Sequence, residues 1–321
     1  MWIALSGDRV VGQIAVQRCG LRAAGRDMAA GWIVNVMILP AFRGHGLGHR
    51  LYEGAAKSGL ALVTLTMALA TRHMAERLGA IALPRMRQWS RIEAPTGRDV
   101  SRYLVARTAY RPNWARAAKL VNRLGASSAL AFAARAGAGA GVRNRLSPPD
   151  VAGGYVFTPV ERFDERIDTV WASVHDRFAG VPRTARHLNW RFGECPQLRY
   201  ERFQVARAGH ILGYLVLRAC EPVELRQGVL VDALALDDDE DVWRALVAYT
   251  SRRFLGQAAS VEAAFSTPAA IRALMRNGFI AGKSYEPTIV CSNKATLAEL
   301  SCVKAWFFNR GDHDWDQIHL A

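Results

Sequence analysis

The sequence predicts an α/β protein built from two similar halves. Residues 2–15 (WIALSGDRVVGQIA) and residues 203–216 (FQVARAGHILGYLV) both show the pattern strand, turn, strand. In both, a glycine stands two residues into the second strand. Each hairpin is followed by an apolar strand, a helix, a further strand and a late helix. With 321 residues, the chain is long enough for two domains of this kind.

The elements of the first half follow one another closely. Residues 32–39 form a nearly unbroken apolar run, which is typical of a strand buried on both faces. We expect a further strand over 62–69 and a helix over 71–78 that ends at Gly79. Residues 81–92 then provide the final strands of this half.

The second half repeats this order, with strands over 228–236 and 260–265 and helices over 242–254 and 268–277. Residues 306–315, which are rich in aromatic side chains, predict a closing strand. Between the halves, Asn113 is placed to cap a helix whose apolar stripe contains Trp114, Ala118, Val121, Leu124 and Ala131. Ser147-Pro148-Pro149 indicates a boundary. We therefore divide the chain into domain 1–93, a basic helical connector 94–150 and domain 151–321.

The positive charge is concentrated in one segment. The chain carries +14, and residues 85–145 contain 13 Lys or Arg against the acids Glu93 and Asp99. A basic amphipathic helix suits an anionic membrane surface, so peripheral membrane contact through 101–136 is one reading. The other is a packed helix with solvated arginines. We expect no nucleic-acid partner, because the segment lacks a recognisable base-reading motif.

Cysteine usage and apolar runs indicate the compartment. The five cysteines are scattered, without a C-x-x-C pair, so we expect neither a disulfide framework nor a metal site. No apolar run reaches the roughly 20 residues of a membrane span, and the start lacks the features of a signal peptide. These features favour a cytoplasmic protein.

The most informative stretch is residues 34–49, VNVMILPAFRGHGLGH. It reads as the end of a strand, a proline, a glycine-rich turn and a helix N-terminus. Backbone N–H groups of such a turn converge with the helix dipole and bind phosphate oxygens. We expect Gly44, Gly46 and Gly48 to let the backbone approach a ligand.

Two common phosphate-binding motifs do not fit this stretch. A Walker loop requires Lys-Ser/Thr after its glycines, and a dinucleotide fingerprint requires Gly-x-Gly-x-x-Gly followed by an acid. The motif that remains, Arg43-x-x-Gly46-x-Gly48 after a strand and a proline, resembles the pyrophosphate loop of the GNAT (GCN5-related N-acetyltransferase) superfamily. The resemblance extends over nearly the whole chain as two GNAT-like folds with mixed sheets, joined by the basic connector.

The resemblance implies acyl-CoA, most simply acetyl-CoA, as co-substrate, and no metal. The pyrophosphate would lie on the six residues Arg43, Gly44, His45, Gly46, Leu47 and Gly48. The pantetheine arm would lie along Val36, Met37 and Ile38. The reaction implied is N-acyl transfer, in which an amine of a small molecule, amino sugar or peptide attacks the thioester directly.

The sequence departs from the family pattern at the catalytic groups. The tyrosine that many members place four residues before the glycine ending the late helix is replaced by Ala75 and by Leu274. Weak candidates for catalysis are Asn35, which would orient a water molecule, and His73. The family also has a strand and two helices before the first hairpin. We therefore expect either an in-frame extension upstream, which we favour, or another segment in their place.

The halves also differ at the glycine-rich turn. The second half has Asp237-Asp238-Asp239-Glu240-Asp241 where the first has glycines, so its turn should repel a pyrophosphate. The alternative function is therefore a non-catalytic GNAT pair that binds a partner or an anionic membrane surface.

Overall fold

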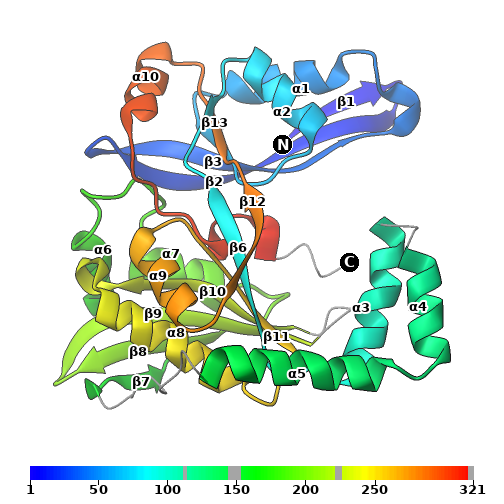
Figure 1. Ribbon diagram of the computed structural model, residues 1–321. Coiled ribbons are helices and arrows are strands. Elements are labelled where there is room, and N and C mark those ends of the chain that lie inside the picture. The colour runs from blue at the N-terminus through cyan, green and yellow to red at the C-terminus, as the bar shows by residue number, and fades with distance from the viewer. Residues whose placement is uncertain (111–113, 144–152, 221–225, 317–321) are drawn as a thin grey trace. The chain divides into compact units, whose positions relative to one another are not determined.

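The computed structural model describes residues 1–110, 114–143, 153–220 and 226–316, and these fold into two compact units (Figure 1). The first unit comprises Met1–Met86, His175–Pro182 and Ser284–Asp316. The second comprises the described residues of 87–174 and 183–283. Each unit contains a mixed sheet with helices, which confirms the predicted fold class.

The sheet of the first unit has the strand order β1-β2-β3-β4-β13-β5. The strands are β1 (Trp2–Ser6), β2 (Arg9–Ala23), β3 (Arg26–Ile38), β4 (Ala61–Thr64), β13 (Thr288–Val290) and β5 (Ile81–Ala82). The β2–β3 hairpin is longer than the predicted strands. Its turn is formed by Ala24 and Gly25, which both have positive φ, as a tight two-residue hairpin turn requires.

Three helices belong to the first unit: α1 (Leu47–Ala56), α2 (Leu69–Arg77) and α10 (Lys294–Cys302). The inner face of α1 presents Leu51, Tyr52 and Ala55 to the sheet. These pack with Ile33 of β3 and Val290 of β13, among other buried residues. The core that supports the glycine-rich turn thus contains side chains from both ends of the sequence.

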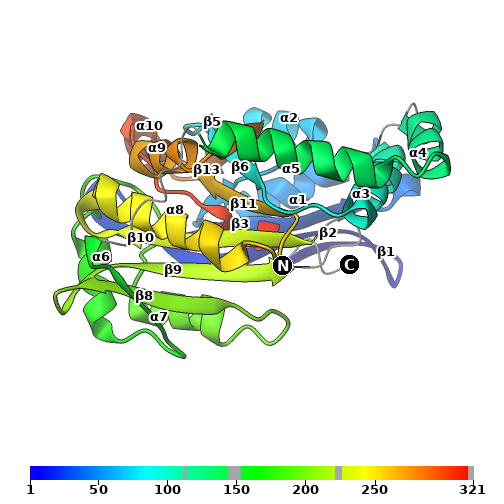
Figure 2. The same cartoon turned by 60° about the horizontal axis from the view of Figure 1, so that its bottom comes forward.

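The sheet of the second unit has the strand order β12-β6-β11-β10-β9-β8-β7. The strands are β12 (Ile280–Tyr285), β6 (Met86–Ile92), β11 (Ser260–Phe265), β10 (Gln227–Ala235), β9 (His210–Cys220), β8 (Glu201–Arg207) and β7 (Val156–Pro159). Helix α8 (Glu240–Phe254) packs on β9 and β10 (Figure 2), next to α9 (Pro268–Arg276). The predicted order of strands and helices is present.

Each sheet contains one strand that is directly preceded in the sequence by a strand of the other sheet. β6 comes directly after β5, yet it pairs with β11, with Ile92 opposite Ser260. β13 comes after β12, yet it lies between β4 and β5, with Ile289 opposite both Val63 and Ile81. The compact units are therefore interleaved along the chain. Our division into 1–93, 94–150 and 151–321 stays a proposal, and its boundary at 150 lies outside the described residues.

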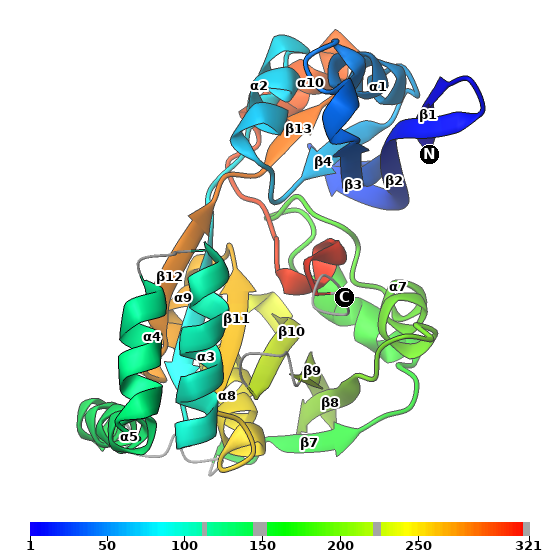
Figure 3. The same ribbon diagram turned by 90° about the vertical axis from the view of Figure 1, so that its right-hand side faces the viewer.

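Within its described residues, the connector forms three helices in the second unit: α3 (Gly97–Tyr110), α4 (Trp114–Arg123) and α5 (Ser127–Arg143). α3 and α4 lie side by side, and α5 crosses one end of the pair (Figure 3). Two residues of the predicted apolar stripe, Ala118 and Ala131, are buried. Leu124, also assigned to this stripe, is 69% exposed and lies beyond the end of α4 at Arg123, where the chain turns at Gly125.

The strand predicted over residues 306–315 is not formed. Trp306 makes an isolated bridge with Ala179, and the chain then takes the 3-10 turns Arg310–Asp312 and Asp314–Asp316. Asn309 and Asp312 cap the first of these turns reciprocally, which favours a turn over an extended chain. Among the helices of the described residues, none has the length and hydropathy needed to cross a bilayer.

Candidate functional site

The glycine-rich segment after β3 folds as a turn that leads into α1. A 3-10 turn spans Pro40–Phe42, and α1 begins at Leu47. Gly44 and Gly46 have φ of +86° and +72°, a region in which glycine is favoured over other residues. No side chain caps α1 at Gly46, and Arg43, Gly44, His45 and Gly46 are all exposed. The first-turn N–H groups are therefore suited to an external anion.

Two further residues of the motif have structural reasons of their own. The Arg43 Nε donates a hydrogen bond to the Ile38 carbonyl at 3.1 Å, which ties the turn to the end of β3. A Cβ at position 48 would lie 2.7 Å from the Met74 Sδ. Gly48 is buried and is needed for the close packing of α1 on α2, whereas Gly44 and Gly46 are needed for their backbone conformation.

β3 carries a bulge just before this turn. Val34 is opposite Ala15 and Met37 is opposite Gln13, so Asn35 and Val36 together face one residue of β2. Asn35 has φ of +51°. A bulge of this kind bends the strand and redirects its backbone groups.

Beyond Trp32, β3 separates from β4. In the described part of the chain, their parallel register runs from Ala30–Ala61 to Trp32–Val63, while β3 continues to Ile38. Val36 and Ile38 pack against the core, and Met37 is 48% exposed. The bulged end of β3 thus offers a backbone edge to an extended ligand, next to the glycine-rich turn.

The weak catalytic candidates lie on the surface. Asn35 is exposed in the bulge. His73 is exposed on α2, and its Nδ1 lies 3.2 Å from the Glu76 Oε2 of the next turn. Ala75 and Leu274 are apolar and buried, so α2 and α9 place no acid at the family's tyrosine position.

The turn of the second unit is closed by its own carboxylates. The Asp239 Oδ1 accepts hydrogen bonds from the backbone N–H of Asp241 at 2.8 Å and of Val242 at 2.9 Å. The Asp238 carboxylate accepts from the Trp243 indole, and Ser173 accepts from the Asp237 N–H. The amides that a phosphate would use at α8 are therefore already hydrogen-bonded within the chain.

The second unit also has a buried polar network on β10, the strand equivalent to β3. Asp232 accepts hydrogen bonds from the Tyr214 hydroxyl at 2.7 Å and from the Arg183 Nε at 3.2 Å. Counting from Gly31 and Gly228, Asp232 corresponds to Asn35. No sequence motif pointed to this carboxylate, although aligning the two halves on Gly31 and Gly228 brings it opposite Asn35. Asp232 is buried and ion-paired, and we assign it a structural role.

A histidine lies close to this network. Burial, together with the guanidinium groups of Arg183 and Arg191, lowers the pKa of His187 to about 3. The imidazole is therefore neutral at physiological pH. It contributes no charge to the second unit until strongly acidic conditions.

The C-terminal segment packs on β3 of the first unit. The His313 Nε2 lies 2.8 Å from the Ile33 carbonyl, one residue after the point where β3 leaves β4. The Trp32 indole packs edge-on against the His313 and Phe308 rings, with centroids 6.1 Å apart in both cases. Residues near the C-terminus thus cover part of β3 close to the bulge, which the sequence did not indicate.

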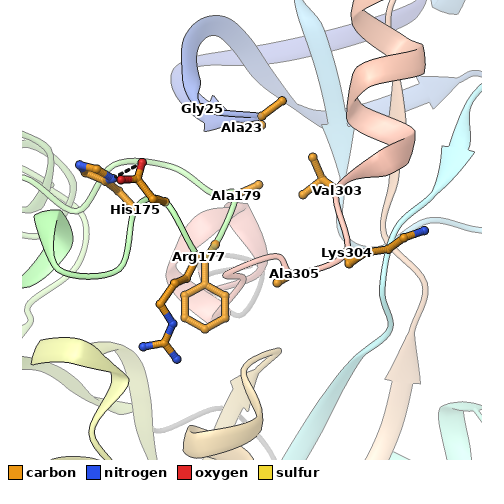
Figure 4. Close-up of a pocket in the computed structure, with 11 residues that line it drawn as sticks. Ala23, Gly25, His175, Arg177, Ala179, Val303, Lys304 and Ala305 are labelled. Atoms are coloured by element: carbon orange, nitrogen blue, oxygen red, sulfur yellow. Dashed lines mark ion pairs between the residues drawn. The ribbon is translucent and has the colours of Figure 1, made fainter.

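A separate pocket of about 270 Å³ lies at the other end of the β2–β3 hairpin (Figure 4). It is lined by residues of three segments, 23–25, 175–179 and 303–305. His175 pairs with Asp176, which also accepts a hydrogen bond from Arg22. None of the lining residues belongs to the bulge or the glycine-rich turn, so this pocket is distinct from the candidate site.

Comparison with known proteins shows which fold this geometry resembles. The model of the acetyltransferase (GNAT) family matches residues 1–83, which contain the bulged β3 and the glycine-rich turn. A GCN5-related N-acetyltransferase from Anabaena variabilis is similar in structure, with a TM-score of 0.55, 12% identity, and coverage of 89% of this chain and 61% of that chain. The chain has a GNAT-like fold. The predicted resemblance is confirmed.

Two other solved structures give comparable values. A probable N-acyltransferase from Enterococcus faecalis has a TM-score of 0.51 and 12% identity, covering 89% of this chain and 59% of that chain. A GCN5-related N-acetyltransferase from Kribbella flavida has a TM-score of 0.50 and 16% identity, covering 89% and 58%. The GNAT-like chain thus spans about three-fifths of the length of these structures. No curated protein sequence matches it significantly.

Proposed function

We propose that the first unit binds an acyl-CoA, most simply acetyl-CoA, and transfers its acyl group to an amine. The observation that supports this is the contrast between two equivalent turns. The first has two glycines at positive φ and an uncapped helix start, and the second is capped by Asp239. The pyrophosphate would lie on Arg43 to Gly48, because backbone N–H groups and the helix dipole favour an anion there.

The bulged end of β3 supplies the other part of the proposed site. The pantetheine arm would pair with Val36, Met37 and Ile38, where β3 has separated from β4. A backbone N–H near the bulge would polarise the thioester carbonyl, as in an oxyanion hole. The amine nitrogen bonds to the carbonyl carbon and the carbon–sulfur bond breaks. The amine loses a proton to water, oriented by Asn35, and the sulfur leaves as a thiolate.

The acceptor we propose is an amine of a small molecule, an amino sugar or a peptide. A thiolate leaves without a proton when its pKa is near that of an ordinary thiol, about 8.5. The reaction therefore does not require the tyrosine that Ala75 replaces. We propose a cytoplasmic protein, since that compartment contains acyl-CoA, with a peripheral contact to membranes.

The site is tested by calorimetric titration of the full chain with acetyl-CoA. We expect Gly46→Glu to abolish binding, because a carboxylate would enter the turn. Gly59→Glu is the matched control: Gly59 also has positive φ (+79°) and open space around its Cβ position, but it lies after α1. Both variants carry the same strain and charge, so equal affinities for the two would disprove the assignment.

The rival function is a non-catalytic binding module, which the buried Ala75 and the closed second turn favour. Thiol release from acetyl-CoA, measured against a panel of amines, separates the two functions. Release that depends on an amine and is lost in Gly46→Glu supports the transferase. Binding of acetyl-CoA without thiol release for any amine supports the module.

A further inference from the structure

The helices of the connector expose basic and apolar side chains together. Within the described parts of α3, α4 and α5, six Arg or Lys side chains are exposed: Arg98, Arg102, Arg116, Lys119, Arg123 and Arg135. These helices and the residue directly after α4 expose five large apolar side chains: Val105, Leu120, Leu124, Leu130 and Phe132. Large apolar side chains exposed in such number on one segment favour an interaction surface.

The acidic residue of these helices, Asp99, does not reduce the positive charge at their surface. Asp99 is buried, and its carboxylate accepts hydrogen bonds from the Thr96 N–H at 2.7 Å and from the Arg226 Nη2 at 3.1 Å. Although burial opposes ionisation, the hydrogen bonds from Arg226 and Thr96 lower the pKa of Asp99 to about 2. Its charge is therefore balanced inside the second unit, and the surface of the three helices is cationic.

The two kinds of side chain are ordered on α4. Ala118 is buried and Asn122 accepts a hydrogen bond from the Ser101 hydroxyl of α3, so these positions mark the inner side of α4. Leu124 directly follows α4 and donates its backbone N–H to the Leu120 carbonyl at 2.9 Å, so it continues the last turn and lies on the same side as Leu120. They are 58% and 69% exposed, with Arg123 between them in the sequence. This is the pattern of an interfacial helix, with apolar groups flanked by cations.

We propose that the outer side of α4, formed by Arg116, Lys119, Leu120, Arg123 and Leu124, docks on an anionic lipid surface. The cations suit lipid phosphates and carboxylates, and the leucines suit the boundary of the acyl chains. A nucleic acid would use the cations but not the exposed leucines. These residues would make the peripheral membrane contact proposed above, and their role does not depend on acyl transfer.

The test is co-sedimentation of the full-length protein with vesicles of phosphatidylcholine alone or with one quarter phosphatidylglycerol. We expect binding to the anionic vesicles only, weakened at 0.5 M salt because the screening length falls. Arg116→Ser/Lys119→Ser/Arg123→Ser should reduce the affinity at least tenfold. Leu120→Ser/Leu124→Ser should reduce it about threefold or more.

The matched control is Arg87→Ser/Arg186→Ser/Arg199→Ser, which removes three exposed arginines of the same unit from other elements. It should bind the vesicles nearly as well as the unaltered chain. Acetyl-CoA affinity, measured in parallel, should be unchanged in all variants, so failure of the lipid surface is distinguishable from failure of the acyl-CoA site.

Three outcomes would overturn the proposal. The first is the absence of binding to anionic vesicles. The second is an equal loss in the control variant, which would mean that charge alone, wherever it lies, attracts the vesicles. The third is binding of duplex DNA that competes with vesicles while the leucine variant keeps full vesicle affinity, which would make the surface a nucleic-acid site.

Discussion

The two units differ in the residue that precedes the helix after their equivalent turns. Gly46 precedes α1 without a capping side chain, whereas Asp239 precedes α8 and accepts hydrogen bonds from two of its amides. The first N–H groups of a helix have no hydrogen-bond partner within the helix, so a residue or ligand outside it must accept from them. The carboxylate stabilises its own helix, and the glycine leaves the amides for an external anion.

At this scale we predict the effect of Asp239→Ala. The variant should lower the free energy of unfolding by about 1 kcal/mol, because N-cap carboxylates contribute that much. Urea unfolding measures the loss, and hydrogen exchange should show faster exchange of the Val242 N–H. Asp241→Ala is the control: Asp241 pairs only with the exposed Arg244 in the contacts described here, so its loss should cost about 0.5 kcal/mol or less. Equal costs for both would contradict the capping role.

At the scale of elements, the interleaved strands determine what each unit needs to fold. β13 supplies Ile289, which is fully buried between β4 and β5. About 200 residues of sequence separate β13 from these two strands. β6 makes the reverse contribution beside β11. The sheet behind the glycine-rich turn is therefore incomplete until the C-terminal part of the chain has joined it.

We predict that Ile289→Asp unfolds the first unit. An unpaired carboxylate in this core should cost several kcal/mol, and the cost should exceed 3 kcal/mol. Hydrogen exchange should show lost protection in β3 and β4, and acetyl-CoA binding should disappear. Ala281→Asp places the same charge on the exposed strand β12 and should keep both properties. Retained protection of β4 in Ile289→Asp would contradict the role of β13.

For the whole molecule, a half-buried neutral histidine connects stability to pH. His187 has a lowered pKa of about 3 in the folded protein, against about 6.5 in an unfolded chain. Between these values the unfolded chain binds a proton that the folded chain does not. The stabilisation is therefore complete above pH 6.5 and is lost as the pH falls toward 3.

We predict that the free energy of unfolding decreases by up to about 1.4 kcal/mol per pH unit below pH 6.5 on account of this one residue. His187→Asn should flatten the profile, measured by urea unfolding between pH 7 and pH 4. His210→Asn, at the exposed turn between β8 and β9, should leave the slope unchanged. An unaltered slope in His187→Asn would show that other groups cause the acid sensitivity.

The sequence by itself determined the local features of this protein. Gly44 and Gly46 encode a turn at positive φ, the acids at 237–241 encode a capped helix, and the repeated hairpins predict two α/β halves. These follow from backbone conformation and short-range hydrogen bonds, which neighbouring residues specify. The proposed roles of residues 36–38 and 43–48 rest on the same local pattern.

The tertiary structure decided which strand completes which sheet, where Leu124 points and what covers β3 near Ile33. An apolar segment such as Thr288–Val290 fits either sheet equally well, because hydrophobic burial has no preference for one partner. Residues 81–92 were expected to supply the final strands of the first half, but packing of the whole chain pairs Met86–Ile92 with β11 of the other sheet.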